Sequence, residues 1–242
     1  MFLAYKTDIG KKREENQDAV LSDFIDENVS ISVVCDGMGG AKSGGVASEV
    51  AVTNIFNRIM SGFRIDADSN SIRNLMLSAV HAANTIVFEK SKEDIDKNGM
   101  GTTCVAALVY NKHCYVVSVG DSRAYLLNDE GISQITTDHT YVQALYEQGV
   151  ITKEEQKNHK LKNVITRALG VEDDVEVDYF EFEQSGNFAL ILCSDGLSNY
   201  CSDQILYDFV YGKNLDDAAS NLINYANDQG GRDNITVALI AN

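Results

Sequence analysis

The chain has 242 residues, of which 44% are hydrophobic and 23% are charged, so it is long enough to bury a sizeable core. Its formal net charge of −16 disfavours nucleic acid and anionic membrane surfaces as partners, because like charges repel, and it favours cations. No apolar run approaches the length that spans a bilayer.

The N-terminus and the cysteines indicate a cytoplasmic protein. Residues 1–8 contain no apolar segment long enough for a signal peptide. The five cysteines are an odd number, include no Cys-x-x-Cys pair, and mostly lie inside apolar runs. We therefore expect reduced thiols within the core.

The first part of the chain changes from strand patterns to helix patterns. Short apolar runs predict strands at 2–5, 18–21 and 31–35. Two longer segments, 44–62 and 69–92, carry apolar residues at helical spacing instead. Two long helices in succession predict an antiparallel pair laid across a sheet.

Strand patterns return at 102–110, 114–119 and 123–127 and near Ile132. The tripeptide Asn111-Lys112-His113 predicts a tight hairpin between the first two of these strands. Residues 139–170 are polar and mixed, with weak helical patterns at 141–148 and 152–157. This composition predicts a mobile insertion between elements of the sheets.

The last part of the chain combines three strands with two helices. Strands are predicted at 175–182, 188–193 and 235–240, and helices at 202–211 and 215–228. Asn214 is suited to cap the second helix. The apolar residues change parity within 175–182, which predicts a β-bulge near Tyr179.

The order of these elements contains no alternation of strand and helix. It predicts an α+β fold, a four-layer α-β-β-α sandwich in which antiparallel helix pairs flank two mostly antiparallel sheets. We expect residues 1–242 to form a single domain, with the insertion at about 139–170.

Aspartates stand at the ends of several predicted strands. Three of them follow an apolar run and adjoin a glycine: Asp36, Asp121 and Asp195. Two more flank other strands: Asp18 and Asp233. Converging carboxylates suit hard cations, and glycine leaves a carbonyl such as that of Gly37 accessible to them. Asp-Gly is also a common turn dipeptide, so each aspartate alone would indicate only a turn.

Seven short motifs occur in sequence order: Arg13-Glu14-Glu15-Asn16-Gln17-Asp18, Asp36-Gly37-Met38-Gly39-Gly40, Gly101-Thr102-Thr103, Gly120-Asp121-Ser122-Arg123, Asp138-His139, Ser194-Asp195-Gly196-Leu197 and Gly231-Arg232-Asp233-Asn234-Ile235. Together they resemble the bacterial metal-dependent Ser/Thr protein phosphatases of type 2C, the PPM family. One motif would be weak, but seven in order are specific. They extend over nearly the whole chain.

The resemblance implies a metal centre. Asp36 would bridge two Mn²⁺ or Mg²⁺ ions. Asp195 and Asp233 would complete one site, and the Gly37 carbonyl with waters would complete the other. Asp121, together with Asp195, would hold a weaker third ion.

The resemblance also implies the reaction. A hydroxide that bridges the two ions would attack the phosphorus of phosphoserine or phosphothreonine, and Arg13 would bind the substrate phosphate. Asp18 would orient metal-bound water, and Asn234 is a further candidate for that role. The enzyme would be a monomeric cytoplasmic phosphatase that acts on phosphorylated proteins and opposes a bacterial Ser/Thr kinase.

The chain departs from the family where a general acid is expected. Eukaryotic relatives commonly carry histidine at the place of Met38, and bacterial relatives often carry it at the place of Ala41. The proton for the leaving group would then come from metal-bound water or from elsewhere. His139 is the nearest candidate in the sequence, although its position at the entry to the insertion favours a structural role.

Three other interpretations are weaker. A phosphatase-like binding module without metals would lack a metal aspartate, and all the matched ones are present. A regulatory phosphatase for an anti-sigma-factor antagonist usually carries a sensory domain, so the short chain favours a stand-alone phosphatase. A nucleotide-binding loop at 39–43 fails because Ala41 and Asp36 occupy its glycine positions.

The insertion at 139–170 would serve as a flap that selects substrates.

Overall fold

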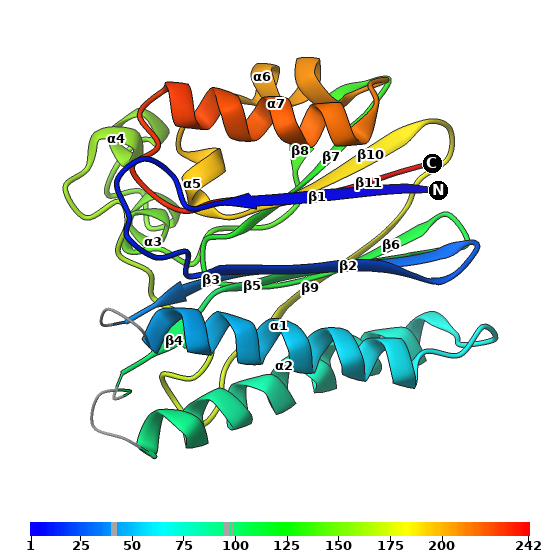
Figure 1. The fold of residues 1–242 in the computed structure, drawn as a ribbon, viewed down its shortest axis with the longest axis horizontal. Coiled ribbons are helices and arrows are strands. Elements are labelled where there is room, and N and C mark those ends of the chain that lie inside the picture. The colour runs from blue at the N-terminus through cyan, green and yellow to red at the C-terminus, as the bar shows by residue number, and fades with distance from the viewer. Residues whose placement is uncertain (40–42, 94–96, 98) are drawn as a thin grey trace.

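A computed structural model describes residues 1–39, 43–93, 97 and 99–242. It shows the four layers expected from the sequence, with a helix pair on the outer face of each of two sheets (Figure 1). Ala41, where the resemblance would place a histidine, lies outside the described residues. No helix in the described part of the chain combines the length and hydropathy needed to cross a bilayer.

The first sheet has five strands in the order β1-β11-β10-β7-β8, and the strand pairs are antiparallel. Its strands are β1 (Phe2–Asp8), β7 (Arg123–Asn128), β8 (Gly131–Gln134), β10 (Phe188–Cys193) and β11 (Ile235–Ala241). Strand β11, the last in the chain, lies between β1 and β10. The two ends of the chain therefore lie close together at one end of the sandwich (Figure 1).

The second sheet has six strands in the order β2-β3-β5-β6-β9, with β4 paired to the end of β3. Its strands are β2 (Asp18–Asp26), β3 (Val29–Met38), β4 (Gly101–Thr102), β5 (Cys104–Tyr110), β6 (His113–Val119) and β9 (Asp178–Glu183). Asn111 and Lys112 form the predicted tight hairpin between β5 and β6, with φ angles of 50° and 66°. Such left-handed pairs match the twist of a hairpin.

Helices α1 (Ser43–Gly62) and α2 (Ser69–Lys92) cover the second sheet, and α6 (Asp203–Val210) and α7 (Leu215–Asp228) cover the first (Figure 1). Apolar side chains fill the space between the two sheets and the space under each helix pair. The five cysteines are reduced and buried, as expected. Asn214 caps α7 by accepting a hydrogen bond from the backbone of Asp217.

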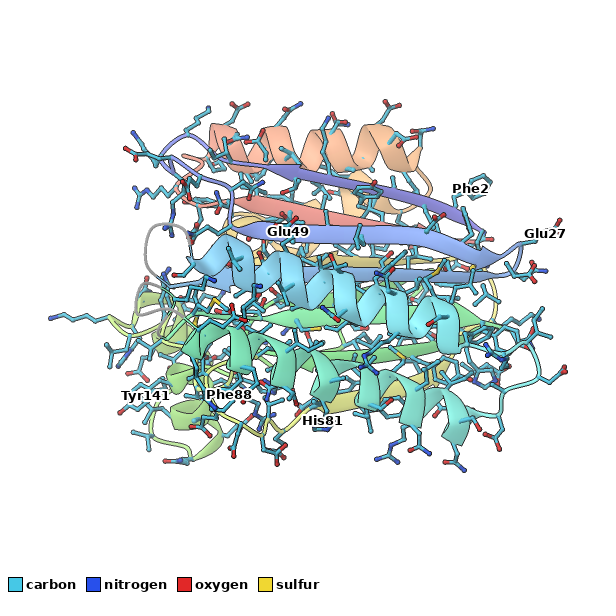
Figure 2. The ribbon with its side chains drawn as sticks, turned by 60° about the horizontal axis from the view of Figure 1, so that its bottom comes forward. Phe2, Glu27, Glu49, His81, Phe88 and Tyr141 are labelled. Carbon is cyan, nitrogen blue, oxygen red and sulfur yellow. The ribbon has the colours of Figure 1, made fainter. Side chains whose placement is uncertain are left out.

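The remaining helices lie at the end of the sandwich opposite the chain termini (Figure 1). Helices α3 (Tyr141–Glu147) and α4 (Lys153–Asn158) form the insertion, and the short α5 (Asp195–Ser198) follows β10. Figure 2 shows Tyr141 of the insertion at this end of the long axis, and Phe2 and Glu27 at the other. The strand-end motifs that contain the aspartates lie at this same end of the sandwich, next to the insertion.

The bulge predicted near Tyr179 is wrong. Strand β9 begins only at Asp178 and pairs with β6 in one uninterrupted register as far as Glu183. Val175 is buried against the core under α1 and α2 but precedes the strand. The change of parity thus marks the start of the strand. A register shift occurs instead between Phe24 and Asp26 of β2.

Gly37 allows β3 and the start of α1 to approach each other closely. A Cβ at this position would lie 2.0 Å from the carbonyl oxygen of Gly44 and 2.7 Å from that of Gln17. The backbone N–H of Gly37 donates to that Gln17 oxygen at 3.0 Å. No side chain fits here without moving the helix away from the strand end that carries Asp36.

We expect Gly37→Ala to destabilise the fold by about 3 kcal/mol or more, because backbone atoms on two sides cannot move apart cheaply. Gly45→Ala is the matched control, since a Cβ there would meet only an ordinary contact at 3.8 Å. Alanine at this helical position should raise stability by up to about 1 kcal/mol. Urea unfolding of both variants measures the difference, and similar midpoints would contradict the close approach.

Candidate active site

Asp18 and Asp36 face each other across the pair β2–β3, where they are direct partners in the register. Asp18 is buried, and its Oδ2 accepts a hydrogen bond of 2.7 Å from the Ser194 hydroxyl. Its Oδ1 is buried without a hydrogen-bond partner among the described residues. An unpaired buried carboxylate oxygen is costly unless a water or a cation meets it.

Asp195 and Asp233 reach the same place from the first sheet, in which β10 and β11 are neighbours. Asp195 begins α5 directly after β10, and Asp233 precedes β11 by two residues. Gly196 brings the two loops into contact, since a Cβ there would lie 1.8 Å from the Asn234 carbonyl oxygen and 3.5 Å from the Cβ of Asp233. The two sheets thus deliver aspartates to one point between them.

The carboxylates raise one another's pKa. Desolvation and the charges of Asp18, Asp195, Asp121 and Asp233 hold the pKa of Asp36 well above its usual range. Desolvation is also the largest cause for the others, raising the pKa of Asp18 and Asp121 to about 7 and that of Asp195 to about 6. Such mutual repulsion marks a place where positive charge is missing.

Arg13 lies at the edge of this group on the loop between β1 and β2. Its Nη2 donates a hydrogen bond of 2.8 Å to Asp233 Oδ2, and this bond raises the pKa of the guanidinium. The side chain is 51% exposed. Nε and Nη1 have no hydrogen-bond partner in the part of the chain that the structure describes.

Asn234 holds this loop in place. Its Oδ1 accepts from the backbone N–H of Gln17 at 2.8 Å, and its Nδ2 donates to the carbonyls of Ile9 and Glu15, both at 3.0 Å. The amide is therefore engaged in positioning residues 9–17, which include Arg13. These bonds favour a structural role over the water-orienting role considered for Asn234.

Thr102 and Thr103 fix the backbone of Asp36. Thr102 Oγ1 and the Thr103 N–H both donate to the Asp36 carbonyl at 2.9 Å, and the Asp36 N–H donates to Thr103 Oγ1 at 2.9 Å. Thr103 Oγ1 also lies 2.7 Å from Ser122 Oγ, next to Asp121. The sequence marked these threonines as part of a motif, but their partners become visible only in the fold.

His139 cannot serve as a free general acid. Its ring is 8% exposed and both nitrogens are engaged: Gly120 N–H donates to Nδ1 at 3.0 Å, and Nε2 lies 3.2 Å from Asp178 Oδ2. Met38 ends β3 and packs against Gly101, where its thioether offers no proton. The structural interpretation of His139 is the one that these contacts favour.

The side chains gathered here offer oxygen ligands, which suit Mg²⁺ or Mn²⁺. Within the described residues, no three His, Cys, Asp or Glu side chains already converge as the ligands of one cation. Asp233 instead directs one oxygen to Arg13. The raised pKa values and the unpaired Asp18 oxygen fit a site that closes around a cation when one binds.

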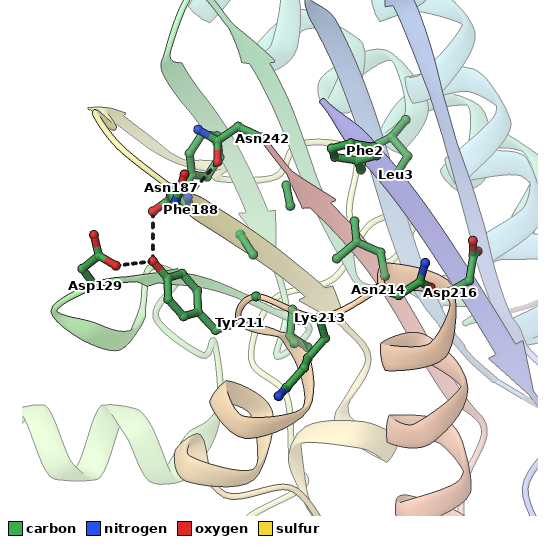
Figure 3. Close-up of a pocket in the computed structure, with 15 residues that line it drawn as sticks. Phe2, Leu3, Asp129, Asn187, Phe188, Tyr211, Lys213, Asn214, Asp216 and Asn242 are labelled. Carbon is green, nitrogen blue, oxygen red and sulfur yellow. Dashed lines mark hydrogen bonds between the residues drawn. The ribbon is translucent and has the colours of Figure 1, made fainter.

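A cavity of about 580 Å³ lies elsewhere, between the start of β1, the end of β11 and the connection from α6 to α7 (Figure 3). Tyr211 lines this cavity, and its hydroxyl donates a hydrogen bond of 2.7 Å to Asp129. The residues that line it include none of the strand-end aspartates. The chemistry of the carboxylate group is therefore separate from this cavity.

Comparison with known proteins agrees with this geometry. The family model described as Protein phosphatase 2C matches residues 10–239. The chain belongs to the protein phosphatase 2C family. It is 37% identical over 241 residues to serine/threonine phosphatase stp of Listeria monocytogenes, covering 99% of this chain and 95% of that protein. It is 34% identical over 243 residues to protein phosphatase PhpP of Streptococcus pneumoniae, covering 100% and 97%.

Solved structures of such phosphatases share the fold. Serine/threonine phosphatase Stp1 from Staphylococcus aureus superimposes with a TM-score of 0.92 at 34% identity, covering 99% of this chain and 94% of that one. The catalytic domain of PstP in complex with two manganese ions gives a TM-score of 0.86 at 32% identity, covering 100% and 97%. The α+β sandwich and the family predicted from the seven motifs are thus confirmed.

The raised pKa values predict how the stability of the metal-free phosphatase depends on pH. The folded-state pKa values of Asp18, Asp121 and Asp195 lie near 6 to 7, above the ordinary value of 3.8. The folded state then binds more protons than the unfolded state between these values. The free energy of unfolding should therefore fall as the pH rises from about 4 to about 7.

Asp36→Asn should weaken this effect, because it removes one of the repelling charges. In EDTA at pH 7.5, we expect the variant to be more stable than the natural chain by about 1 to 2 kcal/mol, or roughly 2 to 8 °C in Tm. The gain should shrink at pH 5. Asp66→Asn, in the exposed connection between α1 and α2, is the control. A gain that is equal at both pH values would contradict the assigned repulsion.

Proposed function

We propose that the strand-end aspartates of this protein serine/threonine phosphatase hold two Mn²⁺ or Mg²⁺ ions next to the phosphate of the substrate. Asp36 would be shared by both cations, with Asp195 and Asp233 on one and the Gly37 carbonyl on the other. The observation that carries the proposal is the burial of converging carboxylates from two sheets; desolvation and then the neighbouring charges raise the pKa values of Asp36 and Asp195. The substrates are phosphorylated proteins.

When bound, divalent cations acidify water for attack on phosphorus and offset the charge of the phosphoryl oxygens. Arg13 would hold the substrate phosphate in the right place. Its side chain is half exposed, and its Nε and Nη1 have no hydrogen-bond partner among the described residues. A guanidinium offers a planar fork of donors that matches phosphate oxygens. The hydrogen bond to Asp233 fixes the direction of that fork.

Asp18 would orient the attacking water. Its Oδ1 is unpaired, while its Oδ2 is fixed by the Ser194 hydroxyl, so the carboxylate cannot turn freely. In the metal-free protein, burial raises the pKa of this carboxyl to about 7. It lies directly opposite Asp36 in the β2–β3 register.

A third, weaker cation would be held by Asp121 together with Asp195. After desolvation, the charge of Asp195 is the largest cause that raises the pKa of Asp121, so the two carboxylates face a common space. The proton for the leaving group would come from water, since Met38 has none to give and the ring of His139 is engaged at both nitrogens.

We further propose that residues 1–242 act as a single phosphatase domain, as a monomer in the cytoplasm, and oppose a Ser/Thr kinase. The family model extends over residues 10–239, which supports the single domain. The kinase follows from the chemistry, because phosphoserine and phosphothreonine in proteins are products of such enzymes.

The insertion at 139–170 would act as the flap that selects substrates. It presents large apolar side chains to solvent: Tyr141, Tyr146, Val150, Leu161 and Val164, each at least 41% exposed. Such a concentration of exposed apolar groups is typical of a surface that contacts another protein. Its two ends are anchored beside the aspartates, through His139 and Leu169.

Hydrolysis of an aryl phosphate tests the metal mechanism. We expect turnover with Mn²⁺, loss of turnover in EDTA, and a loss on the order of 100-fold or more in Asp36→Asn, since changing even an outer contact of a metal site costs 10- to 100-fold. Asp66→Asn should retain full turnover. Activity that survives both chelation and Asp36→Asn would refute the mechanism.

Two flap variants test substrate selection. Tyr146→Ser and Val150→Ser should change kcat/KM for a phosphoprotein about three- to tenfold, because each removes apolar contact area. Turnover of an aryl phosphate, too small to reach the flap, should stay the same. Ile65→Ser, 52% exposed between α1 and α2, is the control. Equal changes for both substrates would argue against a selecting flap.

A further inference from the structure

The loop that carries Asp121 is held on both sides by two consecutive residues. Before it, the Gly120 N–H donates to His139 Nδ1 at 3.0 Å, and the His139 N–H donates to the Gly120 carbonyl at 2.9 Å. After it, Arg123 donates to both oxygens of Asp138, with its Nε at 2.8 Å and its Nη2 at 2.6 Å. Asp138 and His139 thus clamp the segment in which Asp121 stands.

The His139 ring joins this loop to the base of the flap. Because a backbone N–H can only donate, Nδ1 is the acceptor. Nε2 lies 3.2 Å from Asp178 Oδ2 and 3.1 Å from Arg167 Nη1. Arg167, near the end of the flap, donates to the other oxygen of Asp178 at 2.8 Å. The Thr166 N–H donates to the His139 carbonyl at 2.8 Å. Both ends of the flap therefore meet at His139.

The loop has little freedom to find other partners. Gly120 has a φ of +100°, and a Cβ there would lie 2.6 Å from Thr103 Cγ2, so Thr103 blocks movement on that side. The hydrogen bond from Gly120 to His139 is itself buried. Without the ring nitrogen, this N–H would lose its acceptor, and the loop would have to shift to reach water.

We propose that His139 is a positioning residue, whose Nδ1 fixes the Gly120–Asp121 backbone so that Asp121 is preorganised for the third cation. The inference rests on the proposed role of Asp121. It follows the general behaviour of metal sites, in which groups behind the ligands set their orientation and thereby the affinity. His139 would act through Gly120 and would touch neither substrate nor cation.

Calorimetric Mn²⁺ titration of the full chain tests this proposal. The third site is identified as the binding step that disappears from the isotherm in Asp121→Asn. His139→Ala should weaken that site about tenfold and leave the other sites as they are. His139→Asn should restore most of the affinity, since its Oδ1 can accept from Gly120 in place of Nδ1. His113→Ala, in the hairpin at the far end of β6, is the control for loss of a histidine.

Each outcome decides the matter. Third-site affinity that is unchanged in His139→Ala overturns the inference. An equal loss of affinity in His139→Ala and His139→Asn at matched Tm also overturns it, because the hydrogen-bond acceptor would then not matter. An isotherm that Asp121→Asn leaves unaltered overturns the third site itself, and the positioning role with it. A loss in His139→Ala that His139→Asn reverses supports the inference even if the alanine variant is less stable.

Discussion

The burial of several carboxylates close together is the constraint on which the site of this phosphatase depends. Backbone hydrogen bonds between β2 and β3 of one sheet bring Asp18 and Asp36 face to face, and the neighbours β10 and β11 of the other sheet add Asp195 and Asp233. The three apolar layers of the sandwich hold this arrangement together, with help from local hydrogen bonds such as those of Ser194 to Asp18 and Arg13 to Asp233. A cation that binds only the folded state would then raise the free energy of unfolding by mass action.

The same constraint explains how an acidic protein receives an anionic substrate. The net charge of −16 opposes a phosphate at long range, but screening at physiological salt limits that field to about 8 Å. Close to the site, the proposed cations and the guanidinium of Arg13 would determine the potential. Asn234 keeps Arg13 there by holding residues 9–17 through three hydrogen bonds. The loop proposed to bind phosphate is therefore held by the residue next to Asp233.

The sequence predicted the layers well because their patterns are strong. The pattern at 69–92 matches α2 at both ends, and 188–193 matches β10, since each carries a clear period of apolar residues. The four-residue α5 has no such period and was not predicted. The bulge at Tyr179 was wrong because parity alone cannot tell a strand from the irregular segment before it. The partners of His139 come from Asp178 and Arg167, and only the fold brings these together.

The flap combines weak packing with firm anchoring. Helix α3 buries only Val142 and α4 buries no residue, so the insertion contributes little to the apolar layers. Its ends are different: Leu169 exchanges two backbone hydrogen bonds with Thr102, which also holds the Asp36 carbonyl. Leu169 and His139 thus tie the two ends of the insertion to the backbone segments that carry Asp36 and Asp121.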